Sequence, residues 1–239
     1  METEHQGFFR MMKEIKTLLT PHTTDLKKIR VGGKWDGSYV IADLSPDVCF
    51  SYGSNDDIKF ENGLFDVYET KSIVFDHTID GITNKPDHIT FHKEGLFTGI
   101  DLDRQTQEYT GQRALLKMDI EGSEWGVFAE NLNLSKFQQV VCELHFFGVG
   151  YKYYPIITQG LQNIRKTHTP IHVHGTRWPI NPWLDINFPV VLEVTFLNNT
   201  LVNSDVDMGK YPNDLDWDFD EEYKFPECSW WKTDFHRLI

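Results

Sequence analysis

Short apolar runs alternate with helical patterns along most of the chain. Seven runs have the length and the flanking turn residues of buried strands, at residues 47–53, 72–76, 88–92, 114–122, 139–145, 171–175 and 189–198. Apolar residues recur at helical spacing over 8–20, 59–70, 122–134 and 155–168. Strands that alternate with helices predict a mostly parallel sheet covered on both faces, which is the doubly wound α/β class.

The last two predicted strands are joined by a segment of a different kind. The intervening RWPINPWLDINF contains prolines and tryptophans and is not typical of a helix. Parallel neighbours need a long crossover, usually a helix, so we expect the final strand, 189–198, to be antiparallel.

The length of the chain suits one domain. It has 239 residues and 27.9 kDa. We expect a single domain over 1–239, with a helical N-terminal extension at 1–29. Residues 205–239 are rich in acidic and aromatic residues and are predicted to form a tail that wraps the surface.

The charge balance argues against a nucleic-acid partner. The net charge is −13, from 23 basic and 36 acidic residues, which repels a phosphate backbone. No stretch of 18 apolar residues and no apolar signal segment occurs, so no membrane association is expected. Three cysteines, Cys49, Cys142 and Cys228, form no disulfide framework. These features predict a cytoplasmic protein, and they say nothing of its oligomeric state.

Polar residues follow several of the predicted strands, at the edge where doubly wound sheets bind ligands. Ser51, Tyr52, Gly53 and Ser54 end the first strand, and Asp76 ends the second. A carboxylate in the position of Asp76 is typical of the acid that accepts ribose hydroxyls in nucleotide-binding α/β folds. The alternative is a carboxylate that caps a helix or turn.

A second polar group follows the fourth and fifth strands. Asp119 ends one of them, and Glu143 and His145 end its expected neighbour. Two carboxylates and an imidazole suit Mg²⁺ or Mn²⁺, so Asp119, Glu143 and His145 are candidate metal ligands. In the competing interpretation Asp119 caps the following helix and Glu143 forms a salt bridge.

Two further histidines, His172 and His174, point to one face of the sixth strand because side chains alternate along a strand. A Zn²⁺ pair would fit this spacing, but no cysteine-rich partner accompanies it.

Several segments resemble the FkbM-type methyltransferases. LLKMDIEGSEWGVF (115–128) resembles the Lys-x-Asp-x-Glu-Gly-x-Glu signature of that family. Other segments are similar to its remaining motifs in the same order: RVGGKWDGSYV (30–40), FSYGSNDDIKFE (50–61), VFDHTID (74–80), VCELHFF (141–147) and IHVHGTRW (171–178). The resemblance covers about residues 30 to 200. No single motif is specific by itself, and the specificity lies in the combination of these motifs.

The resemblance implies a Rossmann-like, seven-stranded class I methyltransferase fold with S-adenosylmethionine as cofactor. It implies O-methylation of a hydroxyl on a sugar, a glycan or a similar polyol. Carried onto this sequence, Ser51, Tyr52, Gly53 and Ser54 line the methionine part and Asp76 the ribose, and Asp119 is a further cofactor-binding residue. His77, Gly95 and Leu96 flank the adenine, and Arg30, Asp36 and Glu61 border the methionine end or the acceptor side.

Methyl transfer to a hydroxyl needs loss of its proton, with or without a divalent cation that lowers the pKa of the hydroxyl. Asp119, His145 and His174 are the expected catalytic residues. With a cation, Asp119, Glu143 and His145 would hold it; without one, His145 or His174 would be the general base, oriented by Asp119 or Glu143. Two alternatives remain: a catalytically inactive methyltransferase-fold module that binds a glycan or protein partner, and a metal hydrolase built on the histidines. The chain lacks the HExxH pattern of the latter class.

Overall fold

The computed structural model describes residues 4–34, 37–130, 132–146, 153–175, 180–183, 186–189, 191–207 and 214–216. Most of the predicted tail at 205–239, Cys228 and Asp36 therefore lie outside the described residues. Cys49 and Cys142 are buried and free.

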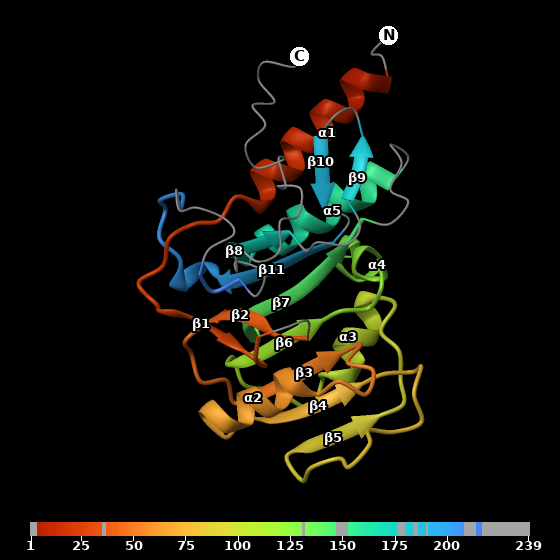
Figure 1. Cartoon of the computed structure of the whole chain (residues 1–239), viewed down its shortest axis with the longest axis vertical. Helices are drawn as coiled ribbons and strands as arrows, with labels where there is room; N and C mark the ends of the chain where they lie inside the picture. The colour runs from red at the N-terminus through yellow and green to blue at the C-terminus, as the bar shows by residue number, and fades with distance from the viewer. Residues whose placement is uncertain are drawn as a thin grey trace.

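A seven-stranded sheet forms the centre of the molecule, in the order β5-β4-β3-β6-β7-β11-β8 (Figure 1). Its strands are β3 (Val48–Tyr52), β4 (Lys71–Phe75), β5 (Ile89–His92), β6 (Ala114–Met118), β7 (Phe137–His145), β8 (His168–Gly175) and β11 (Val191–Asn198). Strand β11 runs antiparallel between β7 and β8, and β3 to β7 pair in parallel. This confirms the predicted Rossmann-like fold of methyltransferase type, with its last strand antiparallel.

The helices are α1 (Glu4–Leu19), α2 (Lys59–Tyr68), α3 (Gly99–Gln105), α4 (Glu124–Ala129) and α5 (Tyr154–Arg165), with the 3-10 helix η2 (Asn199–Leu201). Helices α1 and α5 lie side by side at the upper end of Figure 1. Two short antiparallel pairs complete the description, β1 (Lys28–Val31) with β2 (Tyr39–Ala42), and β9 (Ile180–Trp183) with β10 (Ile186–Pro189).

The two faces of the sheet differ in chemistry. One face buries apolar side chains, such as Phe50, Leu116 and Val194, against α1, α3, α4 and α5 in the main core. The other face carries buried polar side chains from five strands: Ser51, Lys117, Gln139, Glu143, His172, His174, Glu193 and Thr195. This face therefore carries two buried carboxylates, Glu143 and Glu193, and two buried histidines, His172 and His174.

The β1–β2 hairpin and α2 cover this polar face. Tyr39 and Ile41 of β2 pack with Val141 in a second apolar cluster. The side-chain amide of Gln139 accepts from Ala42 N at 2.8 Å and donates to Ala42 O at 3.0 Å. The hydroxyl of Thr195 donates to the carbonyl of Val40. Side chains of the sheet thus satisfy backbone groups of the hairpin.

The sheet ends in two unlike edge strands. Strand β5 has four residues. Strand β8 contains Pro170, whose carbonyl accepts from His22 N at 2.8 Å, and the Nζ of Lys28 donates to Ile171 O at 3.1 Å. The pairing of β11 with β8 also shifts register between Thr195 and Phe196.

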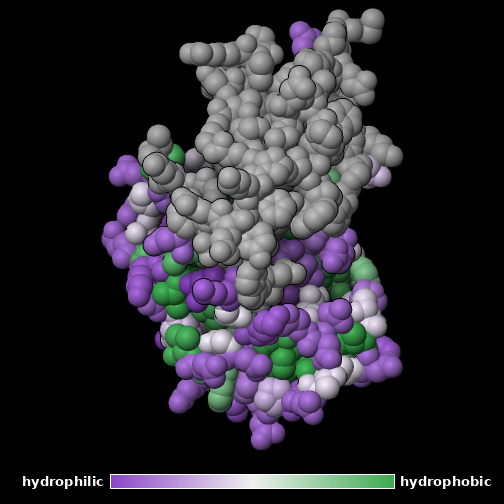
Figure 2. Space-filling view, in the orientation of Figure 1, coloured by the Kyte–Doolittle hydropathy of each residue, from purple (hydrophilic) through white to green (hydrophobic). Residues whose placement is uncertain are grey.

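Some predicted elements differ in extent. The helix expected over 122–134 is the six-residue α4. It begins only after a turn with positive φ at Glu121 (55°) and Gly122 (99°), and it ends at Ala129 because Glu130 is extended (φ −77°, ψ 160°). The segment between the last two large strands contains β9 and β10, which agrees with its predicted non-helical character. None of the helices in the described part of the chain combines the length and the apolar composition that crossing a membrane requires. In Figure 2 the half of the surface around β3 to β5 is mainly hydrophilic with scattered hydrophobic residues.

Candidate functional site

A pocket opens at the carboxyl ends of β3, β4 and β6, where doubly wound sheets bind their ligands. Its walls come from four segments of the chain. The lining residues are Tyr52, Gly53, Asn55, Phe75, Asp76, His77, Thr78, Glu94, Gly95, Leu96, Phe97, Asp119, Ile120, Glu121 and Ser123. Seven of the residues selected from the sequence are among them: Tyr52, Gly53, Asp76, His77, Gly95, Leu96 and Asp119.

Gly53 lies in the pocket wall at the end of β3. Its φ is +72°, and its N–H donates to Phe75 O at 3.1 Å. A β-carbon at this position would lie 1.7 Å from the carbonyl oxygen of Asp119. Asp119 N in turn donates to Tyr52 O at 3.0 Å. Backbone therefore packs directly on backbone here, and only glycine satisfies both the conformation and the space.

Asp76 forms part of the pocket wall with its carboxylate held in place. Oδ1 accepts from the backbone N–H and the hydroxyl of Thr78, at 2.8 and 2.6 Å, and Oδ2 accepts from Asn55 N at 2.8 Å. Burial alone would raise the pKa of Asp76, but these hydrogen bonds lower it below its ordinary value. The carboxylate is thus ionised, and Oδ2 keeps one acceptor position.

Aromatic and apolar residues also line the pocket, among them His77, Leu96 and Phe97. The rings of His77 and Phe97 meet edge to face, with centroids 5.1 Å apart. Phe97 is 51% exposed although it is a large apolar residue. The sequence does not indicate Phe97, because nothing in a Gly-Leu-Phe turn shows which of its side chains faces a pocket.

Three expected cofactor residues, Ser51, Ser54 and Glu61, are buried but are not among the lining residues. The Ser51 hydroxyl donates to Glu61 Oε1, and the Ser54 hydroxyl donates to Asn55 O at 3.3 Å. Oε2 of Glu61 is buried with no hydrogen-bond partner among the described residues. Glu61 therefore retains a free acceptor next to the end of β3.

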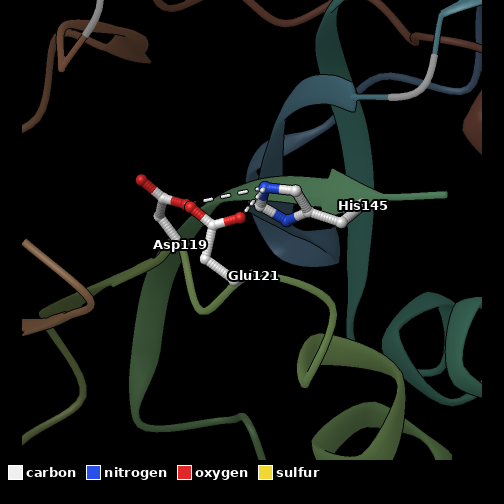
Figure 3. A group of neighbouring side chains, drawn as sticks. All are labelled: Asp119, Glu121 and His145. Carbon is white, nitrogen blue, oxygen red and sulfur yellow. Dashed lines mark ion pairs between the residues drawn. The ribbon is translucent and has the colours of Figure 1, made fainter. Parts of the chain in front are cut away.

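A polar cluster lies beside the pocket at the ends of β6 and β7 (Figure 3). Nε2 of His145 lies 3.9 Å from Asp119 Oδ1 and 3.6 Å from Glu121 Oε2. Glu143 Oε2 is 3.8 Å from the same nitrogen. The expected neighbours Asp119, Glu143 and His145 do come together. Glu121 joins them, and it rather than Glu143 completes the group whose ligand atoms all lie within 4.8 Å of one another.

Glu124 fixes the orientation of the His145 ring in this cluster. It is fully buried, and its Oε1 lies 3.0 Å from His145 Nδ1 and accepts from Ile120 N at 2.9 Å. The indole N–H of Trp125 donates to His145 O at 2.6 Å. Burial lowers the pKa of His145, but the hydrogen bond and charge of Glu124, with Asp119 and Glu143, raise it to about 9. The imidazole is therefore mainly protonated at neutral pH.

Lys117 and Tyr39 lie on the other side of Asp119. Lys117 Nζ donates to Gly53 O at 3.1 Å and lies 3.7 Å from Asp119 Oδ2. Burial lowers the pKa of Lys117, but Asp119, Glu61 and Glu143 outweigh it, so the pKa is raised. The Tyr39 hydroxyl is 3.2 Å from Glu143 Oε1, and burial, with the charges of Asp119 and Glu193, raises the pKa of Glu143 to about 8.

The expected catalytic residue His174 belongs to a separate buried group. Its Nδ1 lies 3.3 Å from Glu193 Oε2, and His172 Nε2 lies 2.8 Å from Asp216 Oδ1. Arg30, expected near the acceptor side, is 3.8 Å from Glu193 and 3.7 Å from Asp216. Strands β7 and β11 stand between the strand of His174 and that of Asp119.

Comparison with known proteins adds little to this picture. No protein-family model matches the sequence, and no curated protein sequence matches it. Among solved structures, the chain is similar to one from a fibrillarin/Nop5p complex, with 8% identity, 65% of this chain and 74% of that chain covered, and a TM-score of 0.44.

Two further matches are chains named as hemolysins. The one from Streptococcus thermophilus has 9% identity and a TM-score of 0.36, with 64% of this chain and 60% of that chain covered. The one from Lactococcus lactis has 10% identity and a TM-score of 0.37, with 64% and 80% covered. Because these similarities are distant, the fold assignment rests on the strand order and direction.

Proposed function

We propose that this chain is an S-adenosylmethionine-dependent O-methyltransferase of the FkbM type, acting on a hydroxyl of a sugar, a glycan or a similar polyol. The observation that carries the proposal is Asp76, an ionised carboxylate held at the end of β4 in the wall of a pocket in a sheet of methyltransferase topology. The motif order around it supports the same family.

The residues present suit the parts of this cofactor. Oδ2 of Asp76 would accept a hydrogen bond from the ribose, and His77, Leu96 and Phe97 would give the adenine an apolar and aromatic surface. The buried Oε2 of Glu61 lacks a partner among the described residues, and the ammonium of the methionine part would satisfy it. When bound, the cofactor supplies a methyl group on a positively charged sulfur.

On the acceptor side, Asp119 is the residue proposed to take the proton from the hydroxyl. Its carboxylate lies in the pocket wall, whereas His145 does not line the pocket. His145 and Lys117 face its two oxygens at 3.9 and 3.7 Å, so the protein holds this carboxylate from both sides. His145 is thus a positioning residue in this proposal, and His174, which β7 and β11 separate from β6, receives no proton.

The sequence also predicts that a divalent cation assists methyl transfer. Such a cation would bind at the polar cluster of Asp119, Glu121, Glu143 and His145. Metal binding there can be measured without cofactor or acceptor, so it is tested separately from methyl transfer.

Calorimetric titration of S-adenosylhomocysteine into the full chain tests the cofactor site. We expect micromolar binding that Asp76→Ala weakens at least tenfold. The matched control is Asp80→Ala, which removes an exposed carboxylate paired with Lys93 in the same loop and should leave the affinity unchanged. Absence of binding to the wild-type chain would overturn the proposal.

Transfer of a labelled methyl group to a panel of sugars and glycans tests the reaction. We expect transfer that Asp119→Asn abolishes while S-adenosylhomocysteine still binds. Cofactor binding without transfer to any hydroxyl would favour the inactive module that binds a glycan or protein partner.

A further inference from the structure

We propose that Asp119, Glu121 and His145 together bind one divalent cation, Mn²⁺ or Mg²⁺, at the carboxyl ends of β6 and β7. This inference goes beyond methyl transfer, because it concerns ion binding by the chain itself. It also differs from the ligand set expected from the sequence, since Glu121 takes the place of Glu143.

The spacing of the ligand atoms suits a shared ion better than direct hydrogen bonds. Nε2 of His145 is 3.9 Å from Asp119 Oδ1 and 3.6 Å from Glu121 Oε2, and the three groups offer atoms within 4.8 Å of one another. Ligands about 2.1 Å from one ion lie roughly 3 to 4 Å apart. The side chains converge on one point in Figure 3.

The contact between Nδ1 of His145 and the carboxylate of Glu124 independently points to a metal site. Nδ1 of His145 faces Oε1 of the fully buried Glu124 at 3.0 Å. Histidines that bind metals generally donate their second N–H to a carboxylate, which fixes the ring and the tautomer. Here that contact directs Nε2 toward the carboxylates of Asp119 and Glu121. A cation bound there would take the place of the proton on Nε2, which is released to solvent.

The two carboxylate oxygens of Asp119 face different partners, which supports ion binding through one of them. Oδ2 faces Lys117 Nζ at 3.7 Å and accepts from the Tyr39 hydroxyl at 3.4 Å. Oδ1 is the oxygen that faces His145. Asp119 can therefore bind an ion through Oδ1 while Oδ2 keeps its cationic and hydroxyl neighbours.

The donor set and its exposure favour a hard divalent cation. Two carboxylates act with one imidazole, and Glu143 adds a further acidic group 3.8 Å from the same nitrogen. The Glu121 side chain is 79% exposed. An ion held there keeps bound water molecules, as Mg²⁺ and Mn²⁺ usually do in proteins.

Titration of the purified full chain with Mn²⁺, followed by electron paramagnetic resonance of the free ion, tests the proposal. We expect one bound Mn²⁺ that Mg²⁺ displaces. Glu121→Gln should weaken binding at least tenfold; its side chain is exposed, so the fold should persist. The control Glu108→Gln removes an exposed charge on another surface and should leave the affinity unchanged.

A second variant tests the role of the buried carboxylate. Glu124→Gln should weaken Mn²⁺ binding about tenfold, the usual effect of losing such a partner, with circular dichroism confirming the fold. Absence of Mn²⁺ binding, or equal affinity in Glu121→Gln and Glu108→Gln, would overturn the proposal. The titration contains no cofactor, so its failure leaves the cofactor site untouched, and failure of S-adenosylhomocysteine binding leaves the ion result standing.

Discussion

The carbonyl oxygen of Asp119 lies 1.7 Å from the point that a β-carbon on Gly53 would occupy. The turn after β6 therefore rests on the end of β3 with no side chain between them. Since Gly53 and Asp119 both line the pocket, its shape depends on this contact.

We predict that Gly53→Ala destabilises the protein more than Gly122→Ala does. Both glycines have positive φ, +72° and +99°, but a β-carbon on Gly122 meets nothing within 4 Å. The strained backbone alone should cost roughly 1–2 kcal/mol at Gly122. Gly53→Ala should add about 1–3 kcal/mol for the clash. Urea unfolding of the two variants measures the difference, and equal losses would contradict it.

Phe97→Ala should weaken cofactor binding with little change in stability. The ring is 51% exposed and forms part of the pocket wall beside His77. We expect about a tenfold weaker affinity for S-adenosylhomocysteine, in line with the loss of one aromatic contact of ~1 kcal/mol or slightly more. Ile100→Ala is the control, because Ile100 is 74% exposed and does not line the pocket. The same affinity in both variants would rule out the role of Phe97.

His168 should make the protein less stable in mild acid. Burial lowers its pKa to about 4, opposed by the hydrogen bond to Phe137 O. Between pH 4 and 6.5 the unfolded chain binds a proton that the folded chain does not, so stability rises with pH across this window. The contribution lost between pH 7 and pH 5 is about 2 kcal/mol.

Unfolding of the wild-type chain and of His168→Gln at these two pH values checks the prediction. Glutamine cannot bind the proton, so the pH dependence of the variant should be smaller by that amount. An unchanged pH dependence would show that His168 titrates normally.

Gln139→Ala should loosen the β1–β2 hairpin. The substitution leaves Ala42 N and Ala42 O without the amide that now satisfies both. Two buried backbone groups without partners should cost about 2–4 kcal/mol. Gln107→Ala, at an exposed position, should change the free energy of unfolding by less than about 0.5 kcal/mol. Hydrogen exchange at β2 should rise in the first variant only.

All seven strands of the main sheet were predictable because each is a compact apolar run with clear ends. The β1–β2 hairpin was not, because much of its anchorage comes from residues distant in sequence, such as Gln139 and Thr195. Helix α3 was missed because it has only seven residues. The capping box of Thr98 and Asp101 holds it, rather than a long apolar stripe.

The residues of the candidate site also divide into those that a local sequence pattern indicates and those that it does not. Asp76, Asp119 and His145 stand at strand ends, where the sheet itself determines their place. Glu121 and Glu124 lie on a turn whose direction depends on positive φ angles at Glu121 and Gly122. No periodic pattern indicates such a turn, so the sequence favoured Glu143 as the third ligand.

The unlike edges of the sheet bear on how copies of this chain meet one another. A long, flat edge strand offers unpaired backbone groups to a second molecule and promotes aggregation. Here one edge is limited to the four residues of β5. At the other, Pro170 lacks an N–H, and His22 and Lys28 already occupy neighbouring carbonyls. Within the described residues, neither edge presents a continuous ladder, so strand addition between copies is disfavoured at both ends of the sheet.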